Sequence, residues 1–195
     1  MREGGYRMGV AFDGDGDRAI FVDRRGRVVD GDAVHADVRA PHEGAGAPEA
    51  ATRVVATVMS NIGLEIALRE SGIELVRCPV GDKYVMEEMI KRDISMGGEQ
   101  SGHIIFSDHL FTGDGIATAL NVLRTMADTG RELADLASEL VAYPQVLVNV
   151  RVRERNGARV GARDRARRWS GVEARLAGQG ACWSGIRAPS RCCAS

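Results

Sequence analysis

The stretch VVATVMSNIGLEIALRESGIELVR, residues 54–77, contains two short apolar runs separated by a segment with helical spacing. VVATV (54–58) and IELVR (73–77) are rich in branched apolar residues, which is typical of strands. The segment between them carries residues at the spacing of one helix face: Leu64, Ala67, Leu68 and Ser71. A strand, a helix near 61–71 and a second strand in this order predict part of an α/β fold.

The alternation continues on both sides of this stretch. Downstream, we expect the following elements: helix 82–92, strand 102–106, helix 114–129, helix 132–141 and strand 145–152. For helix 114–129 the expected apolar face consists of Ile116, Leu120, Leu123 and Ala127. Upstream, strands are expected at 9–13, 19–23 and 27–31, with a hairpin turn at 24–26 between the last two. The sequence therefore predicts one α/β domain over residues 27–143.

The composition excludes several classes of partner. The chain has 26 Lys and Arg against 27 Asp and Glu, so it lacks the basic surface of a nucleic-acid or membrane-surface protein. No apolar run reaches the roughly 18 residues of a membrane span. The first residues, MREGGYRMGVAF, lack the apolar stretch of a secretory signal. We expect a cytoplasmic protein with no nucleic-acid or membrane partner, and the sequence leaves the oligomeric state open.

Three aspartates alternate with glycines in FDGDGDRAIFVD, residues 12–23. In an extended segment Asp13, Asp15 and Asp17 point to one side, where their charges repel unless a cation lies between them. An EF-hand loop needs Gly at its sixth position and an acid at its twelfth, and those positions hold Arg18 and Arg24. Two interpretations stay open, a Mg²⁺ site and a solvated Asp/Gly turn. Arg18 suits a phosphate ligand beside such a metal.

Two further segments carry polar residues suited to ligands. GGEQSGHIIF (97–106) places Glu99, Ser101 and His103 between glycines before an apolar strand, which favours either a polyhydroxylated ligand or an ordinary polar turn. His103 is also a candidate proton shuttle or a hydrogen-bonded structural residue. In CPVGDKYVMEEM (78–89), Asp82 is the expected N-cap of a helix. Lys83, in the first turn of this helix, can reach an anion.

In combination, these segments resemble the α-D-phosphohexomutase family. The resemblance rests on the following motifs, in order from about residue 8 to 152: AFDGDGDR, VVDGD, VVATVMSNIGLE, CPVGDKYVMEEM, GGEQSGHIIF, FTGDG and YPQVLVNV. TVMSN and YPQVLVNV favour the branch that acts on glucosamine phosphates. The alternatives are the phosphomannomutase/phosphoglucomutase branch and a non-catalytic remnant that binds metal or sugar phosphate.

The resemblance implies an enzyme, an intramolecular phosphotransferase. Members of the family have four domains around one cleft and move a phosphoryl group between O6 and O1 of a sugar phosphate, through a phosphoserine and a bisphosphorylated intermediate. The implied roles are Mg²⁺ binding by Asp13, Asp15 and Asp17, contact of Arg18 with the transferring phosphate, sugar recognition by Glu99 and Ser101, and a polar contribution to catalysis from His103. Lys83 is the further candidate for substrate binding.

The chain also departs from the family pattern. The family's nucleophile loop, of the Thr-Ala-Ser-His-Asn-Pro type, has no counterpart here and is expected upstream of residue 1. We therefore expect a C-terminal fragment that is inactive alone. Its expected parts are a remnant of domain two with the metal loop (1–26), an intact domain three with the sugar loop (27–143) and an incomplete domain four (144–195).

The C-terminal sequence ACWSGIRAPSRCCAS (181–195) carries three cysteines in a pattern that fits no common zinc site. The family's fourth domain instead ends with a phosphate loop, Arg-x-Ser-Gly-Thr-Glu-Pro. With permitted synonymous codons, a shifted reading frame of 181–195 can encode Leu-Val-Arg-x-Ser-Gly-Thr-Glu-Pro-Leu-Leu-Arg-Val. We interpret the tail as the product of a frameshift, with a genuine Cys-rich tail as the alternative.

Overall fold

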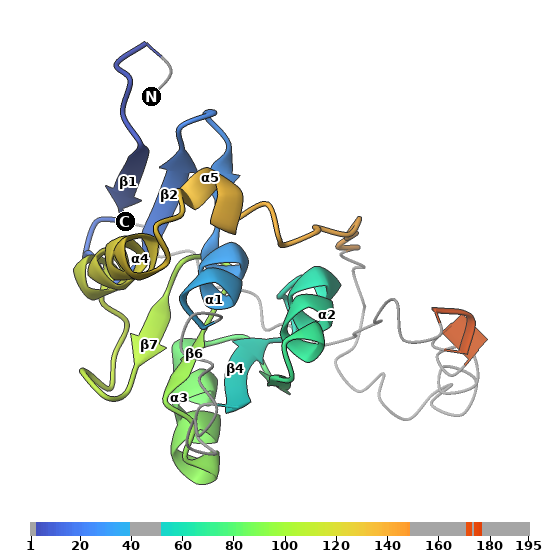
Figure 1. Cartoon of the computed structure of the whole chain (residues 1–195). Coiled ribbons are helices and arrows are strands. Elements are labelled where there is room, and N and C mark those ends of the chain that lie inside the picture. The colour runs from blue at the N-terminus through green and yellow to red at the C-terminus, as the bar shows by residue number, and fades with distance from the viewer. Residues whose placement is uncertain (1–2, 40–51, 149–170, 173, 177–195) are drawn as a thin grey trace, which may run out of the picture. The chain divides into compact units, whose positions relative to one another are not determined.

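The computed structural model describes residues 3–39, 52–148, 171–172 and 174–176. The chain divides into two compact units, Met1–Pro144 and Gln145–Ser195. The helices and strands labelled in Figure 1 belong to the first unit. The assignment of 1–26, 27–143 and 144–195 to three domains of a longer protein stays a prediction, and the frameshift hypothesis for 181–195 lies outside the described residues.

A four-stranded sheet with the order β5-β4-β6-β7 forms the centre of the first unit. Its strands are β4 (Arg53–Thr57), β5 (Glu74–Cys78), β6 (Met96–Gly98) and β7 (Ile104–Phe106). β5 and β6 pair parallel with β4, and β7 pairs antiparallel with β6. Helix α2 (Ile62–Glu70) connects β4 to β5, and α3 (Asp82–Arg92) connects β5 to β6. The strand-helix-strand unit predicted over 54–77 is confirmed, with bounds that differ by one residue.

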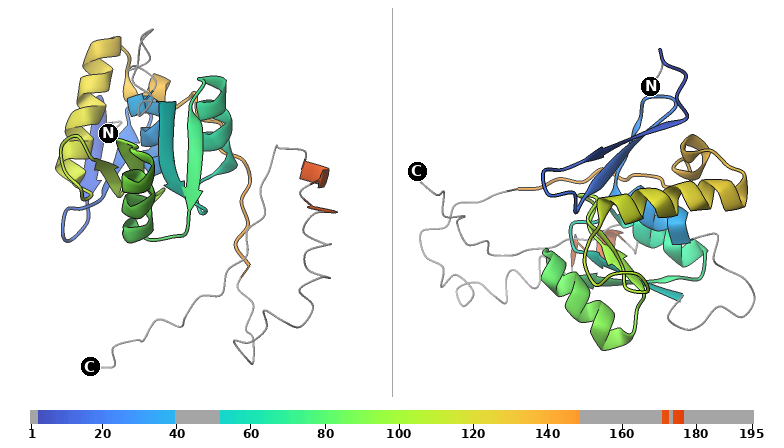
Figure 2. Two further views of the ribbon diagram at one scale, coloured as in Figure 1. Left: turned by 90° about the horizontal axis from the view of Figure 1, so that it is seen from below. Right: turned by 90° about the vertical axis from the view of Figure 1, so that its left-hand side faces the viewer.

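The helices cover both faces of this sheet (Figure 2). Because side chains alternate along a strand, Val54 and Ala56 join one core cluster and Val55 joins another. The first cluster includes Leu68 of α2, and the second includes Met89 of α3. The arrangement is therefore a three-layer α/β fold, as the sequence predicts.

A second, antiparallel sheet consists of β1 (Met8–Phe12), β2 (Ala19–Asp23) and β3 (Val28–Val29). Its turn at 24–26 is held by Asp23, whose carboxylate accepts hydrogen bonds from the backbone of Arg25 and Arg27 and from the Arg27 guanidinium. Helices α1 (Gly31–Arg39) and α4 (Gly115–Thr129) share one core cluster with this sheet, and a short α5 (Leu133–Leu136) completes the unit. The hairpin is thus packed into the same unit as the α/β layers.

Several details differ from the sequence-based expectations. Helix α1 and strand β6 were not predicted, and α5 is shorter than the expected 132–141. Residues 145–148 form no strand, and the rest of the strand expected at 145–152 lies outside the described residues. The N-cap of α3 is Gly81 rather than Asp82, and no side chain caps this helix.

Helix α4 buries a different face from the predicted one. Ile116, Leu120 and Leu123 are 62%, 61% and 47% exposed, so the expected apolar face is turned outward. The buried positions include Thr118, whose hydroxyl donates to the Asp114 carbonyl at 2.8 Å. This bond within the helix lets a polar residue enter the core, and for that reason the apolar spacing alone misidentified the face.

Candidate functional site

The three aspartates of the metal loop (residues 13–18) lie between β1 and β2. One carboxylate oxygen from each of Asp13, Asp15 and Asp17 can be chosen so that all lie within 4.8 Å of one another. The backbone turns sharply here because Gly16 has a φ of 75°, a value that a residue with a side chain rarely adopts. Converging carboxylates of this kind are the oxygen ligands that a hard divalent cation takes, so the residues fit a metal site.

Arg18 is the cation nearest to these carboxylates in the sequence, and it contacts two of them. Its Nε lies 3.4 Å from Asp13 Oδ2 and 3.7 Å from Asp17 Oδ1, and its backbone N–H donates to Asp13 Oδ1 at 3.2 Å. Desolvation acts to raise the pKa of Asp13, but the Arg18 backbone hydrogen bond, the Asp17 side chain and the Arg18 charge outweigh it. The pKa of Asp13 is therefore below its usual value, and the carboxylate is held ionised.

The predicted sugar-binding residues lie in the turn between β6 and β7. Glu99 accepts a hydrogen bond from the Gly81 backbone N–H at 3.0 Å and another from the Ser101 hydroxyl at 3.2 Å. Ser101 is exposed and Glu99 is partly exposed, so both can reach a ligand. The Glu99–Gly81 bond also joins this turn to the start of α3, where Lys83 lies.

The turn between β6 and β7 and the metal loop are in direct contact. His103 Nδ1 lies 2.9 Å from Asp17 Oδ2, Arg18 and His103 form a β-bridge, and the Ala19 N–H donates to the Gly102 carbonyl at 3.1 Å. The structure therefore brings together two groups of predicted site residues that lie far apart in the sequence. His103 itself is only 5% exposed.

Lys83 occupies a different environment from the other predicted residues. Its side chain is 73% exposed, and its ammonium lies 3.6 Å from Glu87 on the same helix. Among the described ion pairs, none joins Lys83 to the metal loop. Its link to the site runs through the backbone of Gly81, so its role as an anion ligand stays a prediction.

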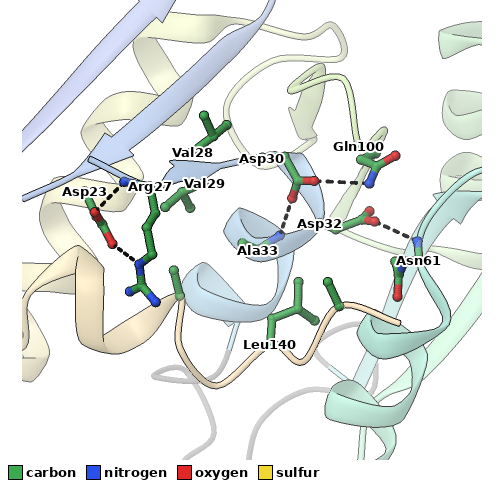
Figure 3. Close-up of a pocket in the computed structure, with 12 residues that line it drawn as sticks. Asp23, Arg27, Val28, Val29, Asp30, Asp32, Ala33, Asn61, Gln100 and Leu140 are labelled. Atoms are coloured by element: carbon green, nitrogen blue, oxygen red, sulfur yellow. Dashed lines mark hydrogen bonds and ion pairs between the residues drawn. The ribbon is translucent and has the colours of Figure 1, made fainter. Parts of the chain in front are cut away.

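A cavity with both polar and apolar lining residues borders the turn between β6 and β7, and the sequence does not predict it. Figure 3 shows this cavity of about 180 Å³, which is lined by Asp30, Asp32, Asn61 and Gln100 among others. Asn61 follows β4 and Gln100 follows β6. These neighbouring strands are connected to strands on opposite sides, β4 to β5 and β6 to β7. Ligands of open α/β sheets bind at the point where the connections diverge in this way. The motifs VVDGD and TVMSN contain three of these residues, but their composition alone gave no sign of a shared cavity.

Asp32 is a deeply buried carboxylate of this cavity, at 1% exposure. Its Oδ2 accepts a hydrogen bond from the Asn61 N–H at 2.7 Å. Burial raises the pKa of Asp32 to about 6, although the hydrogen bond from the Asn61 backbone opposes the shift. The cavity therefore holds a carboxyl group that can change its protonation state near neutral pH.

Comparison with known proteins gives the family. Residues 33–143 match the family model described as phosphoglucomutase/phosphomannomutase, alpha/beta/alpha domain III. The chain belongs to this family. The matched region includes the turn that carries Glu99, Ser101 and His103, whereas the metal loop lies before it.

Individual relatives agree with this assignment to the phosphoglucomutase/phosphomannomutase family. It is 56% identical over 146 residues to a phosphoglucosamine mutase of Caldanaerobacter subterraneus, covering 75% of this chain and 32% of that protein. It is 51% identical over 152 residues to the phosphoglucosamine mutase of Desulforudis audaxviator, covering 78% and 34%. The chain thus spans about a third of the length of the curated relatives it matches.

A solved structure supports the fold. The Aspergillus fumigatus N-acetylphosphoglucosamine mutase, determined in complex with GlcNAc-6P and magnesium, superposes with a TM-score of 0.59 at 23% identity. The match covers 75% of this chain and 35% of that structure. In the part of the chain that the structure describes, no helix is both long and apolar enough to cross a membrane.

Proposed function

We propose that this chain supplies the metal loop and the sugar-reading turn of a phosphoglucosamine mutase, which interconverts glucosamine 6-phosphate and glucosamine 1-phosphate. The observation that carries the proposal is the direct contact between these two segments, through Asp17 and His103 at 2.9 Å. The curated relatives named phosphoglucosamine mutase support the choice of reaction. A cytoplasmic location stays a prediction.

In this proposal Asp13, Asp15 and Asp17 hold Mg²⁺. The ion, when bound, neutralises negative charge on the phosphoryl group and on its attacking and leaving oxygens. With a cation on the carboxylates, the Arg18 guanidinium is available to a phosphate group, which it can bind through two parallel hydrogen bonds. Glu99 accepts hydrogen bonds from sugar hydroxyls, and Ser101 can donate or accept beside it. The residues of this chain therefore position the substrate and neutralise the charge of its phosphate, which are the main contributions of a protein to phosphoryl transfer.

Ligand binding by the purified chain tests the sugar-reading part. With Mg²⁺ present, glucosamine 6-phosphate is expected to shift the NMR signals of residues 99–103 more than mannose 6-phosphate does. Glu99→Gln should weaken the binding because one carboxylate acceptor is lost, whereas Glu74→Gln, an exposed change on β5, should not. Equal binding by the Glu99 variant, or shifts confined to other segments, would contradict the proposal.

We further propose that the chain alone does not turn over substrate, because its sequence contains no match to the serine loop that carries the phosphoryl group. A coupled assay with the purified chain, glucosamine 1,6-bisphosphate and Mg²⁺ should give only background. Turnover that is present in this chain and lost in Asp15→Ala would show that the nucleophile is not required.

A further inference from the structure

The turn that enters α4, residues 113–115 with Gly115 as the first helical residue, contacts both His103 and the metal loop. A Cβ atom added at Gly113 would lie 2.5, 2.6 and 2.7 Å from three atoms of the His103 ring. A Cβ atom added at Gly115 would lie 2.8 Å from the Arg18 carbonyl oxygen and 2.9 Å from that of Gly16. The Gly115 N–H also donates to the Gly16 carbonyl at 2.9 Å. Both positions therefore require a residue without a side chain.

The His103 ring is enclosed between these groups. Nδ1 faces Asp17, while Nε2 is buried and has no hydrogen-bond partner among the described residues. Because the Gly113 backbone lies against the same ring, the imidazole cannot turn toward solvent without moving the turn at 113–115. This enclosure suits a group that fixes the position of Asp17.

We propose that Gly113, Gly115 and His103 are positioning residues that hold the metal loop in the conformation in which its three carboxylates converge. The proposal rests on the metal site of the proposed function. Carboxylates within 4.8 Å repel one another, so a loop without support would open and would have to be reassembled when a cation binds. Packing from behind Asp17 removes part of that cost, as residues behind metal ligands do in other sites.

Cation affinity gives the first test. Mn²⁺, followed by electron paramagnetic resonance, serves as the probe for the Mg²⁺ site of the purified chain. Gly113→Ala and His103→Ala should each weaken Mn²⁺ binding by about 10–100-fold, the usual effect of losing a residue behind a metal ligand. His103→Asn should recover much of the affinity, because its amide can donate to Asp17 from near the Nδ1 position. Leu120→Ala, an exposed change on α4, is the matched control and should bind as the unchanged chain does.

Hydrogen exchange of the metal-free chain gives the second test and needs no cation. In His103→Ala and Gly113→Ala, the amides of Arg18, Ala19 and Gly115 should exchange faster, while those of β4 keep their protection. Unchanged exchange together with unchanged Mn²⁺ affinity would overturn the positioning role. Faster exchange in a chain that never binds Mn²⁺ would leave the positioning role intact and reject the metal site. His103→Ala adds no atoms, so it decides the question if Gly113→Ala fails to fold.

Discussion

Three ionisable side chains of α1 are buried. Burial raises the pKa values of the two aspartates and lowers the pKa of the histidine, so the aspartates destabilise the fold at high pH and the histidine destabilises it at low pH. Asp32, His35 and Asp37 are exposed by 3% or less. Burial lowers the pKa of His35 to about 4 and raises that of Asp32 to about 6. Burial, with repulsion from Glu139, also raises the pKa of Asp37 well above its usual value. The helix therefore favours neutral side chains at all three positions.

Asp32→Asn is expected to stabilise the chain above pH 6. The folded chain holds the Asp32 proton more tightly than the unfolded chain, whose reference pKa is 3.8, so the free energy of unfolding falls as pH rises from about 4 to about 6. Above this window the ionised carboxylate costs about 3 kcal/mol at most. The variant should gain about 1–3 kcal/mol at pH 7.5 and little at pH 4 in urea unfolding. Exposed Asp108→Asn is the control, and a less stable Asp32 variant at pH 7.5 would refute the expectation.

His35→Gln is expected to remove an acid-dependent loss of stability. The pKa of His35 is about 4 in the folded chain against a reference of 6.5, so the unfolded chain binds the proton more tightly. The free energy of unfolding should therefore fall as pH drops from about 6.5 to about 4, by up to about 3 kcal/mol. Urea unfolding at pH 7 and pH 4.5 measures this difference. It should shrink in His35→Gln and persist in the exposed control His109→Gln; an equal loss in both would count against the assignment.

At the scale of elements, the sequence predicts the helices and strands whose patterns are local. The unit at 54–77 shows clear strand and helix spacing, whereas α1 places buried Asp32, His35 and Asp37 among its apolar residues and so conceals its periodicity. β6 has three residues, Met-Gly-Gly, with low strand preference, and it forms because it pairs with β4 and β7. The carboxylates of the metal loop follow from alternation, but the Asp17–His103 contact joins residues 86 apart and has no local signature.

The two apolar faces of α4 should differ in their contribution to stability. Met126 is 7% exposed and Leu120 is 61% exposed. Met126→Ala leaves a cavity in the core and should cost about 2–5 kcal/mol, whereas Leu120→Ala should stay within about 0.5 kcal/mol. Chemical unfolding of the two variants measures the difference. A larger loss of stability in Leu120→Ala would indicate that the face predicted from the sequence is the buried one.

Asn61 joins the start of α2 to the last residues of the first unit. Its side-chain oxygen accepts from the Gly63 and Tyr143 N–H groups, both at 2.9 Å, and its amide donates to the Tyr143 carbonyl at 2.8 Å. Asn61→Ala removes the N-cap and both bonds to Tyr143, so it should lower the free energy of unfolding by about 1–3 kcal/mol. Asn121→Ala on α4, which removes a single bond to the Ala117 carbonyl, is the control and should cost less. An equal loss of stability in the two variants would argue against a stabilising role of the Asn61–Tyr143 hydrogen bonds.

At the scale of the whole molecule, the three apolar core clusters that the described residues form lie within the first unit, Met1–Pro144. Limited trypsin digestion should therefore leave a resistant core that ends near residue 150. Arg77, whose side chain is 9% exposed and paired with Glu65, should be protected within that core. Mass spectrometry of the digest identifies the ends. Early cleavage at Arg77, or equal resistance of residues 153–195, would contradict this expectation.

The bridge between Arg18 and His103 also bears on the order of folding. A hairpin such as β1–β2 can form alone within about 1–10 μs, because its strands are neighbours in the chain. The Asp17–His103 contact instead joins residues 86 apart in the sequence. Closing so long a loop costs chain entropy, and that cost is offset only when the contacts of the intervening sheet have formed. The three aspartates are therefore brought to their final geometry late in folding. In a refolding experiment, the capacity to bind a divalent cation should appear with the slowest phase, after the helices and the hairpin have formed.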